Sequence, residues 1–129
     1  MPKATQLVVA LENRPGELAR LCSTLGEAKV NITAILAPEG KKRGKVSLMV
    51  EDLAAAREAL QGAKIRFSEE EVLEADVDNR PGAFGEMAGK LAKSKINIDY
   101  VYVTTSPYGR AKVIMGVRDV AKALRALGE

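Results

Sequence analysis

The chain contains no histidine and no tryptophan, and Cys22 is its only cysteine. Imidazole is the commonest general base and a common metal ligand, so its absence argues against hydrolytic and metal-dependent catalysis. A single cysteine allows no disulfide within the chain, so nothing in the sequence requires an oxidising compartment. The residue types that are missing therefore favour a binding function over a catalytic one.

Long apolar segments and a secretion signal are missing as well. No apolar run approaches the roughly 18 residues that a membrane helix needs, and the N-terminus does not show the charged, apolar and small-residue regions of a signal peptide. We therefore expect a cytoplasmic protein. Apolar residues make up 47% and charged residues 29% of the 129 residues, as in globular proteins. The net charge of +3 is a weak basic bias that does not by itself indicate a nucleic-acid partner.

A four-residue stretch occurs twice in the sequence. Asn13-Arg14-Pro15-Gly16 returns as Asn79-Arg80-Pro81-Gly82, each copy following an apolar run and preceding apolar residues at helical spacing. This internal repeat predicts two units, residues 1–70 and residues 71–129. Units of this size are marginally stable alone, because they bury only about 60% of their unfolded surface, so pairing them is physically reasonable.

The first unit reads as strand, helix, strand, strand, helix, strand. Apolar and β-branched runs predict the strands, and Pro15 and Asp52 suit the starts of the two helices. The basic segment Glu39–Lys45 is expected to be an exposed hairpin turn. The predicted strands are 6–11, 30–36, 46–50 and 64–68, and the predicted helices are 15–25 and 53–60.

The second unit repeats this order but stops early. The polar run Glu69–Glu71 is expected to be a link, after which Val72–Asp78 alternates apolar and acidic residues as a strand with one buried face. Val46–Leu60 aligns with Val113–Leu127, and a one-residue insertion falls near residues 105–109. No fourth strand follows the second helix, so one edge stays open. The N-terminus, another chain or nothing would cover that edge.

Both first helices carry an apolar stripe at the same spacing. We expect both stripes to lie in the core, and we interpret Cys22 as a small buried apolar residue rather than a reactive thiol. The stripes consist of Leu18, Leu21, Cys22 and Leu25, and of Phe84, Met87, Ala88 and Leu91.

The repeated stretch has the features of a small anion-binding turn. A strand that leads through a tight turn into a helix leaves unpaired backbone N–H groups at the helix start, and these favour a carboxylate. Gly16 and Gly82 permit close approach of a ligand, while Asn13 and Asn79 offer a donor and an acceptor. Together they suit the two charged ends of a free amino acid. The alternative is that these residues simply form a good turn.

Two further asparagines recur at a constant distance from the turns. Val30-Asn31-Ile32 and Ile96-Asn97-Ile98 place a poor strand former at the start of each second strand, which suggests a polar role. With Leu11–Leu18, its echo Val77–Phe84 and the βαββαβ order, these motifs make the chain resemble a pair of ACT domains, small regulatory modules that bind amino acids. The resemblance covers nearly the whole chain.

The resemblance implies an α+β fold of two ferredoxin-like βαββαβ units, each an antiparallel sheet with its helices on one face and the second lacking its last strand. It also implies that effectors lie between paired units and that the module is an allosteric regulator without catalytic residues, cofactor or metal. The expected partners are a free amino acid and either a second copy of the chain or an enzyme, with neither nucleic acid nor membrane. The implied ligand-binding residues are Asn13, Arg14, Pro15, Gly16, Glu17, Leu18, Asn31, Ile32, Asn79, Arg80, Pro81, Gly82, Ala83, Phe84, Asn97 and Ile98.

One position weighs against serine as the ligand. Serine-sensing relatives often carry a histidine two residues before the asparagine of the turn, whereas this chain has Leu11 and Val77 there. In the second unit, Tyr100 and Tyr102 share one phase of a strand, where ordinary packing is favoured over an interface or ligand role.

Three alternatives remain at the level of sequence. The chain is a regulatory small subunit of a biosynthetic enzyme, an RNA-binding domain with the same element order, or a small enzyme. The third strands, 46–50 and 113–117, contain no aromatic residues on which RNA bases could stack, and this argues against RNA binding. The enzyme hypothesis lacks a nucleophile and base, because Glu74, Asp76 and Asp78 are expected to face solvent together.

Overall fold

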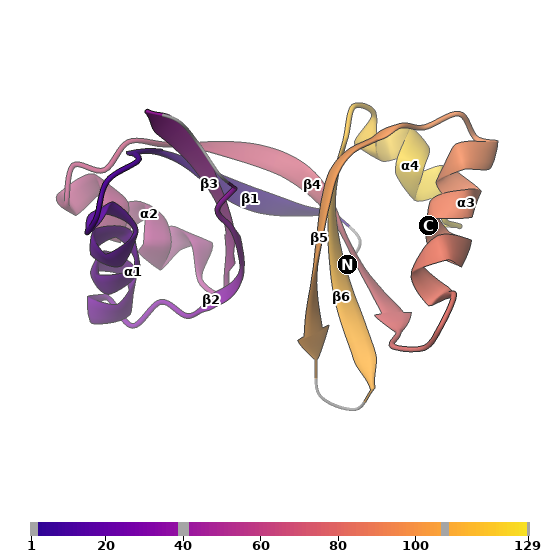
Figure 1. The fold of residues 1–129 in the computed structure, drawn as a ribbon, viewed down its shortest axis with the longest axis horizontal. Helices are drawn as coiled ribbons and strands as arrows, with labels where there is room; N and C mark the ends of the chain where they lie inside the picture. The colour runs from indigo at the N-terminus through magenta and orange to yellow at the C-terminus, as the bar shows by residue number, and fades with distance from the viewer. Residues whose placement is uncertain (1–2, 39–41, 107–108, 129) are drawn as a thin grey trace. The chain divides into compact units, whose positions relative to one another are not determined.

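The structure is a computed structural model that describes residues 3–38, 42–106 and 109–128 (Figure 1). Its chain divides into two compact units. The first-repeat unit is Gln6–Glu70, and the second-repeat unit is Glu71–Glu129 together with the N-terminal residues up to Thr5. The elements are β1 (Lys3–Glu12), α1 (Glu17–Glu27), β2 (Ile32–Leu36), β3 (Arg43–Val50), α2 (Leu53–Gly62), β4 (Phe67–Asp78), α3 (Ala83–Lys93), β5 (Ile98–Ser106), β6 (Arg110–Val117) and α4 (Val120–Ala126).

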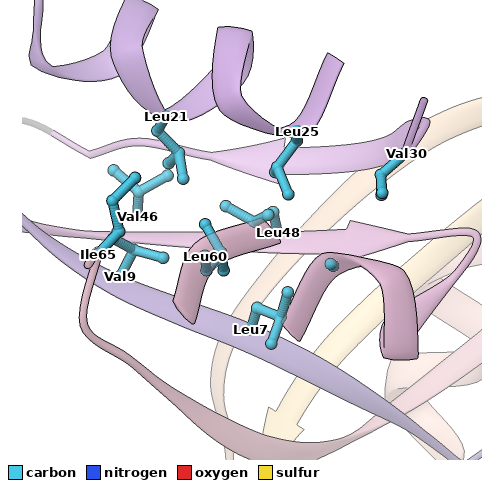
Figure 2. Close-up of a cluster of buried hydrophobic side chains, with 10 residues drawn as sticks. Leu7, Val9, Leu21, Leu25, Val30, Val46, Leu48, Leu60 and Ile65 are labelled. Atoms are coloured by element: carbon cyan, nitrogen blue, oxygen red, sulfur yellow. The ribbon is translucent and has the colours of Figure 1, made fainter. Parts of the chain in front are cut away.

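The first-repeat unit has the strand order β2-β3-β1-β4. Both β1 and β2 run antiparallel to β3, with Leu7 opposite Leu48 and Ile35 opposite Leu48 on the other side. Helices α1 and α2 cover one face of this sheet. Figure 2 shows Leu21 and Leu25 of α1 directed toward Leu60 of α2 and the strand residues, where all of them are fully buried. The helical stripe and the alternating strand residues thus form one core.

The second-repeat unit has the strand order β1-β4-β6-β5, with both β4 and β5 antiparallel to β6. Leu73 lies opposite Met115, and both are fully buried in a core with Leu91 of α3 and Ala123 of α4. The alternation predicted for residues 72–78 holds toward the end of the strand, where Asp76 and Asp78 are exposed and Val77 is partly buried. It fails at the start, because Val72 and Leu73 are both fully buried. The βαββαβ order is therefore confirmed in the first repeat, and the second repeat follows it as β4-α3-β5-β6-α4.

Two strands each serve both units. Strand β4 is continuous from Phe67 to Asp78, so the expectation that Glu69–Glu71 forms a link is wrong. Strand β1 is the hydrogen-bonded neighbour of β4, and its residues up to Thr5 belong to the second-repeat unit. There Lys3 Nζ lies 3.5 Å from a carboxylate oxygen of Glu71. The edge that the sequence leaves open is therefore occupied by the N-terminal residues.

The core prediction is wrong at the first position of each apolar stripe. Leu18 is 42% exposed and Phe84 is 38% exposed, although Leu21 and Met87 are buried as expected. Leu18 borders a cavity, so packed neighbours do not cover it. Cys22 is a free, half-buried thiol, so it is not the fully buried residue that we expected.

Element boundaries differ locally from the sequence-based ranges. Helix α1 starts at Glu17, because Gly16 holds a left-handed conformation at the helix N-cap. Of the expected hairpin turn, residues 39–41 lie outside the described residues, and Arg43–Lys45 already belong to β3. The insertion near residues 105–109 falls between β5 and β6, where 107–108 are not described. No helix within the described residues has the length and apolar character needed to cross a bilayer.

Candidate functional site

The two repeated turns have the same backbone geometry. Asn13 N donates to Lys42 O at 2.8 Å, and Asn79 N donates to Gly109 O at the same distance. Gly16 (φ 94°) and Gly82 (φ 86°) occupy the left-handed region, which a side chain disfavours. The conserved geometry explains why a glycine ends each copy of the stretch: it allows the chain to enter the helix directly after a strand.

The helices that follow these turns begin without a side-chain cap, whereas the other two helices have one. The carboxylates of Asp52 and Asp119 accept hydrogen bonds at 3.0 Å from Ala55 N and Lys122 N at the starts of α2 and α4, which confirms their predicted capping role. No side chain caps α1 or α3. At these starts Glu17 N and Ala83 N donate to the turn carbonyls of Arg14 and Arg80 at 3.4 and 3.2 Å. An external acceptor, which a helix N-terminus prefers to be anionic, would therefore be bound by the N–H groups that follow them.

A cavity of about 320 Å³ lies beside the first turn, and we call it the first-turn cavity. It contains four of the predicted ligand residues, Asn13, Arg14, Glu17 and Leu18, but neither Pro15 nor Gly16. Its remaining walls are Leu11, Glu12, Ala37, Pro38, Gly44 and Val46. The turn, the start of α1 and the ends of two neighbouring strands thus meet around one hollow.

The corresponding hollow of the second-repeat unit, the second-turn cavity, has a volume of about 290 Å³. Of the predicted residues it contains Arg80 and Ala83, whereas Asn79, Pro81, Gly82 and Phe84 do not line it. Its other lining residues are Ala75, Asp76, Val77, Asp78, Glu86, Met87, Lys90, Arg110 and Leu127. The two cavities are similar in size but differ strongly in charge.

The arginine of each turn is held by carboxylates of its own unit. Arg14 lies 3.1 Å from both Glu12 and Glu17, and the hydrogen bond that Arg14 Nε donates to Glu17 is the main reason that the Arg14 pKa is raised. Arg80 pairs with Glu86 at 2.8 Å, and this hydrogen bond lowers the pKa of the Glu86 carboxyl. These groups are exposed to solvent, so the pairs orient side chains rather than add much stability.

Asn31 lies at the other end of its unit from Asn13. Asn13 bonds to Lys42 just before β3, whereas Asn31 O accepts a hydrogen bond from Glu51 N just after it. The eight residues of β3 separate these ends by roughly 27 Å. One small ligand therefore cannot touch Asn13 and Asn31 of the same unit.

The second asparagine of each repeat has a different neighbour. Asn31 Nδ2 donates to a Glu51 carboxylate oxygen at 3.2 Å, whereas Asn97 Nδ2 donates to Asp99 Oδ1 at 3.0 Å. Asn97 lines a third cavity of about 460 Å³ with Lys95, Ile96, Asp99, Arg118, Asp119 and Lys122. Ile32 and Ile98, which we expected to contact a ligand, are partly buried and pack against the hydrophobic cores.

The sequence analysis missed the strand-end residues of the first-turn cavity, including Ala37, Pro38 and Val46. Their spacing from the turn carries no signal, because the fold brings them there from other strands. Arg110, whose Nη1 lies 2.9 Å from Asp78 Oδ1, was missed for the same reason. Among the described residues, no group of three or more acidic, cysteine or histidine side chains is arranged to hold a metal ion.

Comparison with known proteins extends these observations. The sequence matches the protein family described as ACT domain pair over residues 3–122. A search of curated proteins gives no match. A crystal structure of a protein from Bacteroides thetaiotaomicron is similar with a TM-score of 0.91 and 25% identity, over 98% of this chain and 87% of the other.

Two further solved structures share the fold at lower identity. The regulatory subunit of aspartate kinase from Thermus thermophilus has a TM-score of 0.67 and 20% identity, over 99% of this chain and 96% of that subunit. The regulatory subunit of aspartate kinase from Thermus flavus has a TM-score of 0.62 and 19% identity, over 99% and 92% of the two chains.

Proposed function

Since the chain belongs to the family of ACT domain pairs, we propose that it is a non-catalytic regulatory module that binds a free amino acid at its repeated turns. Each repeat supplies one ACT unit. The observation that carries the proposal is the contrast between helix starts: α2 and α4 are capped by aspartates, while α1 and α3 are uncapped beside a cavity. An amino-acid carboxylate would satisfy the N–H groups that the chain leaves available.

The ammonium group of the ligand has suitable partners at the same place. Glu12 and Glu17 place two carboxylates at the first-turn cavity, and the side-chain oxygen of Asn13 is an acceptor in the same cavity. A zwitterionic amino acid presents both charges within a few ångströms, so one ligand can use the helix start and these acceptors together. A ligand with only a negative charge would use only the helix start, and a ligand with only a positive charge would use only the carboxylates and the Asn13 oxygen.

The distance between Asn13 and Asn31 favours a site completed by a second copy of the chain. Strand β2, which follows Asn31, is a terminal strand in the order of its sheet. An edge strand offers unpaired backbone groups to another chain. The asparagine of a second copy would then reach a ligand held at the turn of the first, and ligand binding would stabilise the dimer.

The output of such a module is a change in a partner enzyme. The two Thermus structures are of regulatory subunits of aspartate kinase, and the present chain covers 96% of one and 92% of the other. By analogy we propose that this chain acts as a separate regulatory subunit. The partner enzyme is identified by co-purification from native source, with and without the amino acid that binds.

A thermal-shift screen of the twenty amino acids tests the proposal. Binding to the folded state raises the free energy of unfolding by RT ln(1 + [L]/Kd), about 2.7 kcal/mol at a hundredfold excess of ligand over Kd. We expect at least one amino acid to raise the melting temperature at millimolar concentration. The Asn13→Ala variant should lose that shift while its ligand-free melting temperature stays close to wild type, because Asn13 is exposed.

A matched control separates loss of binding from a general effect of substitution. Ser23 is exposed on α1 and does not line the first-turn cavity, so Ser23→Ala should keep the full ligand shift. Unchanged melting temperatures with all twenty amino acids would contradict the proposal. Loss of folding in Asn13→Ala would instead support the interpretation of the stretch as a turn only.

A further inference from the structure

The first-turn cavity has a continuous apolar wall. Leu11 comes from β1, Leu18 from α1 and Val46 from β3, and Ala37 and Pro38 follow β2. Leu18 remains 42% exposed, although its neighbours along the stripe, Leu21 and Leu25, are fully buried. The exposed surface of Leu18 therefore faces a hollow whose other described lining residues are apolar or glycine at five positions and polar or charged at four. An apolar group placed there would remove that surface from water.

The charged residues of this cavity offer nothing to an acidic side chain. Among the described residues that line it, Arg14 is the only cation, and it is already placed between Glu12 and Glu17 at 3.1 Å from each. These three groups together carry one net negative charge, which disfavours an acidic ligand side chain against this part of the wall, although Lys42 and Arg43 line an adjoining cavity. A basic side chain would compete with the ligand's own ammonium group for the same two carboxylates.

The second-turn cavity has nearly the same size and also five apolar lining residues, but it has twice as many charged ones. Six of its lining residues are charged: Asp76, Asp78, Arg80, Glu86, Lys90 and Arg110. Arg80 reaches Glu86 of α3 at 2.8 Å, and Arg110 reaches Asp78 at 2.9 Å. An apolar group in this hollow would take water from charged side chains without replacing their hydrogen bonds, which is unfavourable.

Two substitutions between the repeats explain the difference. Glu86 stands at the position of Arg20, because the helices align with an offset of 66 residues. Arg20 donates to Ala63 O at 2.8 Å and does not line the first-turn cavity, whereas Glu86 lines the second and holds Arg80. Ala83 likewise replaces Glu17, so Arg80 has no carboxylate at the first helical position and pairs further along α3.

We propose that the first-turn cavity binds the side chain of an apolar amino acid and that the second-turn cavity does not bind it. This inference rests on the proposed function, because it assumes that the ligand is an amino acid held at the turn. The two repeats then differ in role: the first recognises the ligand, and the second keeps the turn as structure with an internal ion-pair network.

Isothermal titration of the full chain with single amino acids tests the inference. Leucine, isoleucine, valine, methionine and phenylalanine represent the apolar class, and serine, aspartate, glutamate and lysine are the comparison set. We expect the best apolar ligand to bind at least tenfold more tightly than every member of the comparison set. The stoichiometry should be one ligand per chain.

Paired variants assign the binding to one repeat. Leu18→Asp puts a charge on the apolar wall at an exposed position and should weaken the best apolar ligand at least tenfold. Phe84→Asp makes the same change at the aligned position of the second repeat, which is exposed but does not line the second-turn cavity, and should change that affinity less than twofold. Melting temperatures without ligand, expected to be close to wild type for both variants, show that each variant is folded.

Each alternative result overturns a different statement. Tightest binding of serine, aspartate, glutamate or lysine, lost in Asn13→Ala, would overturn the apolar assignment and leave the proposed function standing. Equal loss of affinity in Leu18→Asp and Phe84→Asp, or two ligands per chain, would overturn the asymmetry. No binding of any of the twenty amino acids would overturn the proposed function and this inference together.

Discussion

One cross-strand pair occupies the same position in both repeats, but the strand that carries the small residue in the first repeat carries the large one in the second. In the first-repeat unit, Ala34 of β2 pairs with Met49 of β3. In the second-repeat unit, the same positions are Tyr100 of β5 and Gly116 of β6. A Cβ atom at Gly116 would overlap the Tyr100 ring, so the large residue in one strand requires the small one in the other. The repeats therefore conserve the space that the pair fills and not the residues themselves.

The residues around the two repeated turns also differ between the repeats, and there the difference is in charge. Both turns keep the strand, the left-handed glycine and the uncapped helix, while the charged residues around them differ. Near the second asparagine the change reverses sign: Glu51 in the first repeat corresponds to Arg118 in the second, where Arg118 lines a cavity with Asn97. Backbone geometry is thus shared between the repeats, and side-chain chemistry separates them.

The largest expected effect comes from breaking the exchanged pair. Gly116→Met introduces the residue of the first repeat against the Tyr100 ring and should destabilise the protein by about 1–3 kcal/mol through overpacking. The Tyr100→Ala, Gly116→Met double variant recreates the Ala34–Met49 arrangement and should recover much of this loss. Urea denaturation of the full chain measures both. If the double variant showed only the sum of the destabilisations of Tyr100→Ala and Gly116→Met, the two positions would not be coupled.

The turn glycines provide the next largest effect. Gly16→Ala and Gly82→Ala should each cost about 1–2 kcal/mol, because a Cβ disfavours the left-handed conformation. No atom lies within 4 Å of the added Cβ at either site, so the cost comes from the backbone alone. Gly26→Ala is the control, since it lies inside α1 with equal space and should stabilise the chain by about 0.5–1 kcal/mol. Equal destabilisation by all three would rule out this explanation.

The helix caps should show a smaller, repeat-dependent effect. Asp52→Ala and Asp119→Ala each remove one capping acceptor, which costs about 1 kcal/mol. Because α4 has seven residues and α2 has ten, loss of the cap should unfold α4 more completely than α2. Hydrogen exchange of the amides in the two helices measures this difference, and the Asp→Asn variants, which keep an acceptor oxygen, serve as controls. Equal protection of α2 and α4 would contradict the expectation.

The smallest expected effect is a pH dependence in each unit. Hydrogen bonds from Arg57 and Arg80 lower the pKa of Glu69 and Glu86, respectively, below the ordinary value of 4.5. A lowered folded-state pKa gives stabilisation that is present above the unfolded pKa and is lost as pH falls through the folded pKa. Melting temperatures measured from pH 7 down to pH 3 should therefore fall less steeply in Glu69→Gln and Glu86→Gln than in wild type. An unchanged pH profile in both variants would show that these exposed pairs contribute nothing.

Local patterns in the sequence predicted most of the fold because they depend on neighbouring residues. Helical spacing, strand alternation and the capping aspartates identified the βαββαβ order and both caps. Contacts between distant segments were not visible in this way. The residues up to Thr5 complete the second-repeat unit, and Ala37 and Pro38 reach the first-turn cavity, through long-range strand pairing that no local period encodes.

The candidate site was partly predictable for the same reason. The turn, its glycine and the uncapped helix follow from a short motif, so Asn13, Arg14, Glu17 and Leu18 meet at one cavity as the sequence suggested. The position of Asn31 could not be predicted from the motif, because its place at the far end of β3 depends on strand direction and register. Spacing along the chain gives the two asparagines a common pattern but not a common location.

The division of β1 and β4 between two units sets an order for folding during synthesis. The first-repeat unit has all four of its strands once the ribosome has released Glu70. The second-repeat unit emerges after the first, yet its fourth strand contains residues that left the ribosome before either unit was complete. The sheet of the second-repeat unit can therefore be completed only after its remaining strands have been synthesised. Until then, the N-terminal residues are connected through β1 to the first-repeat unit.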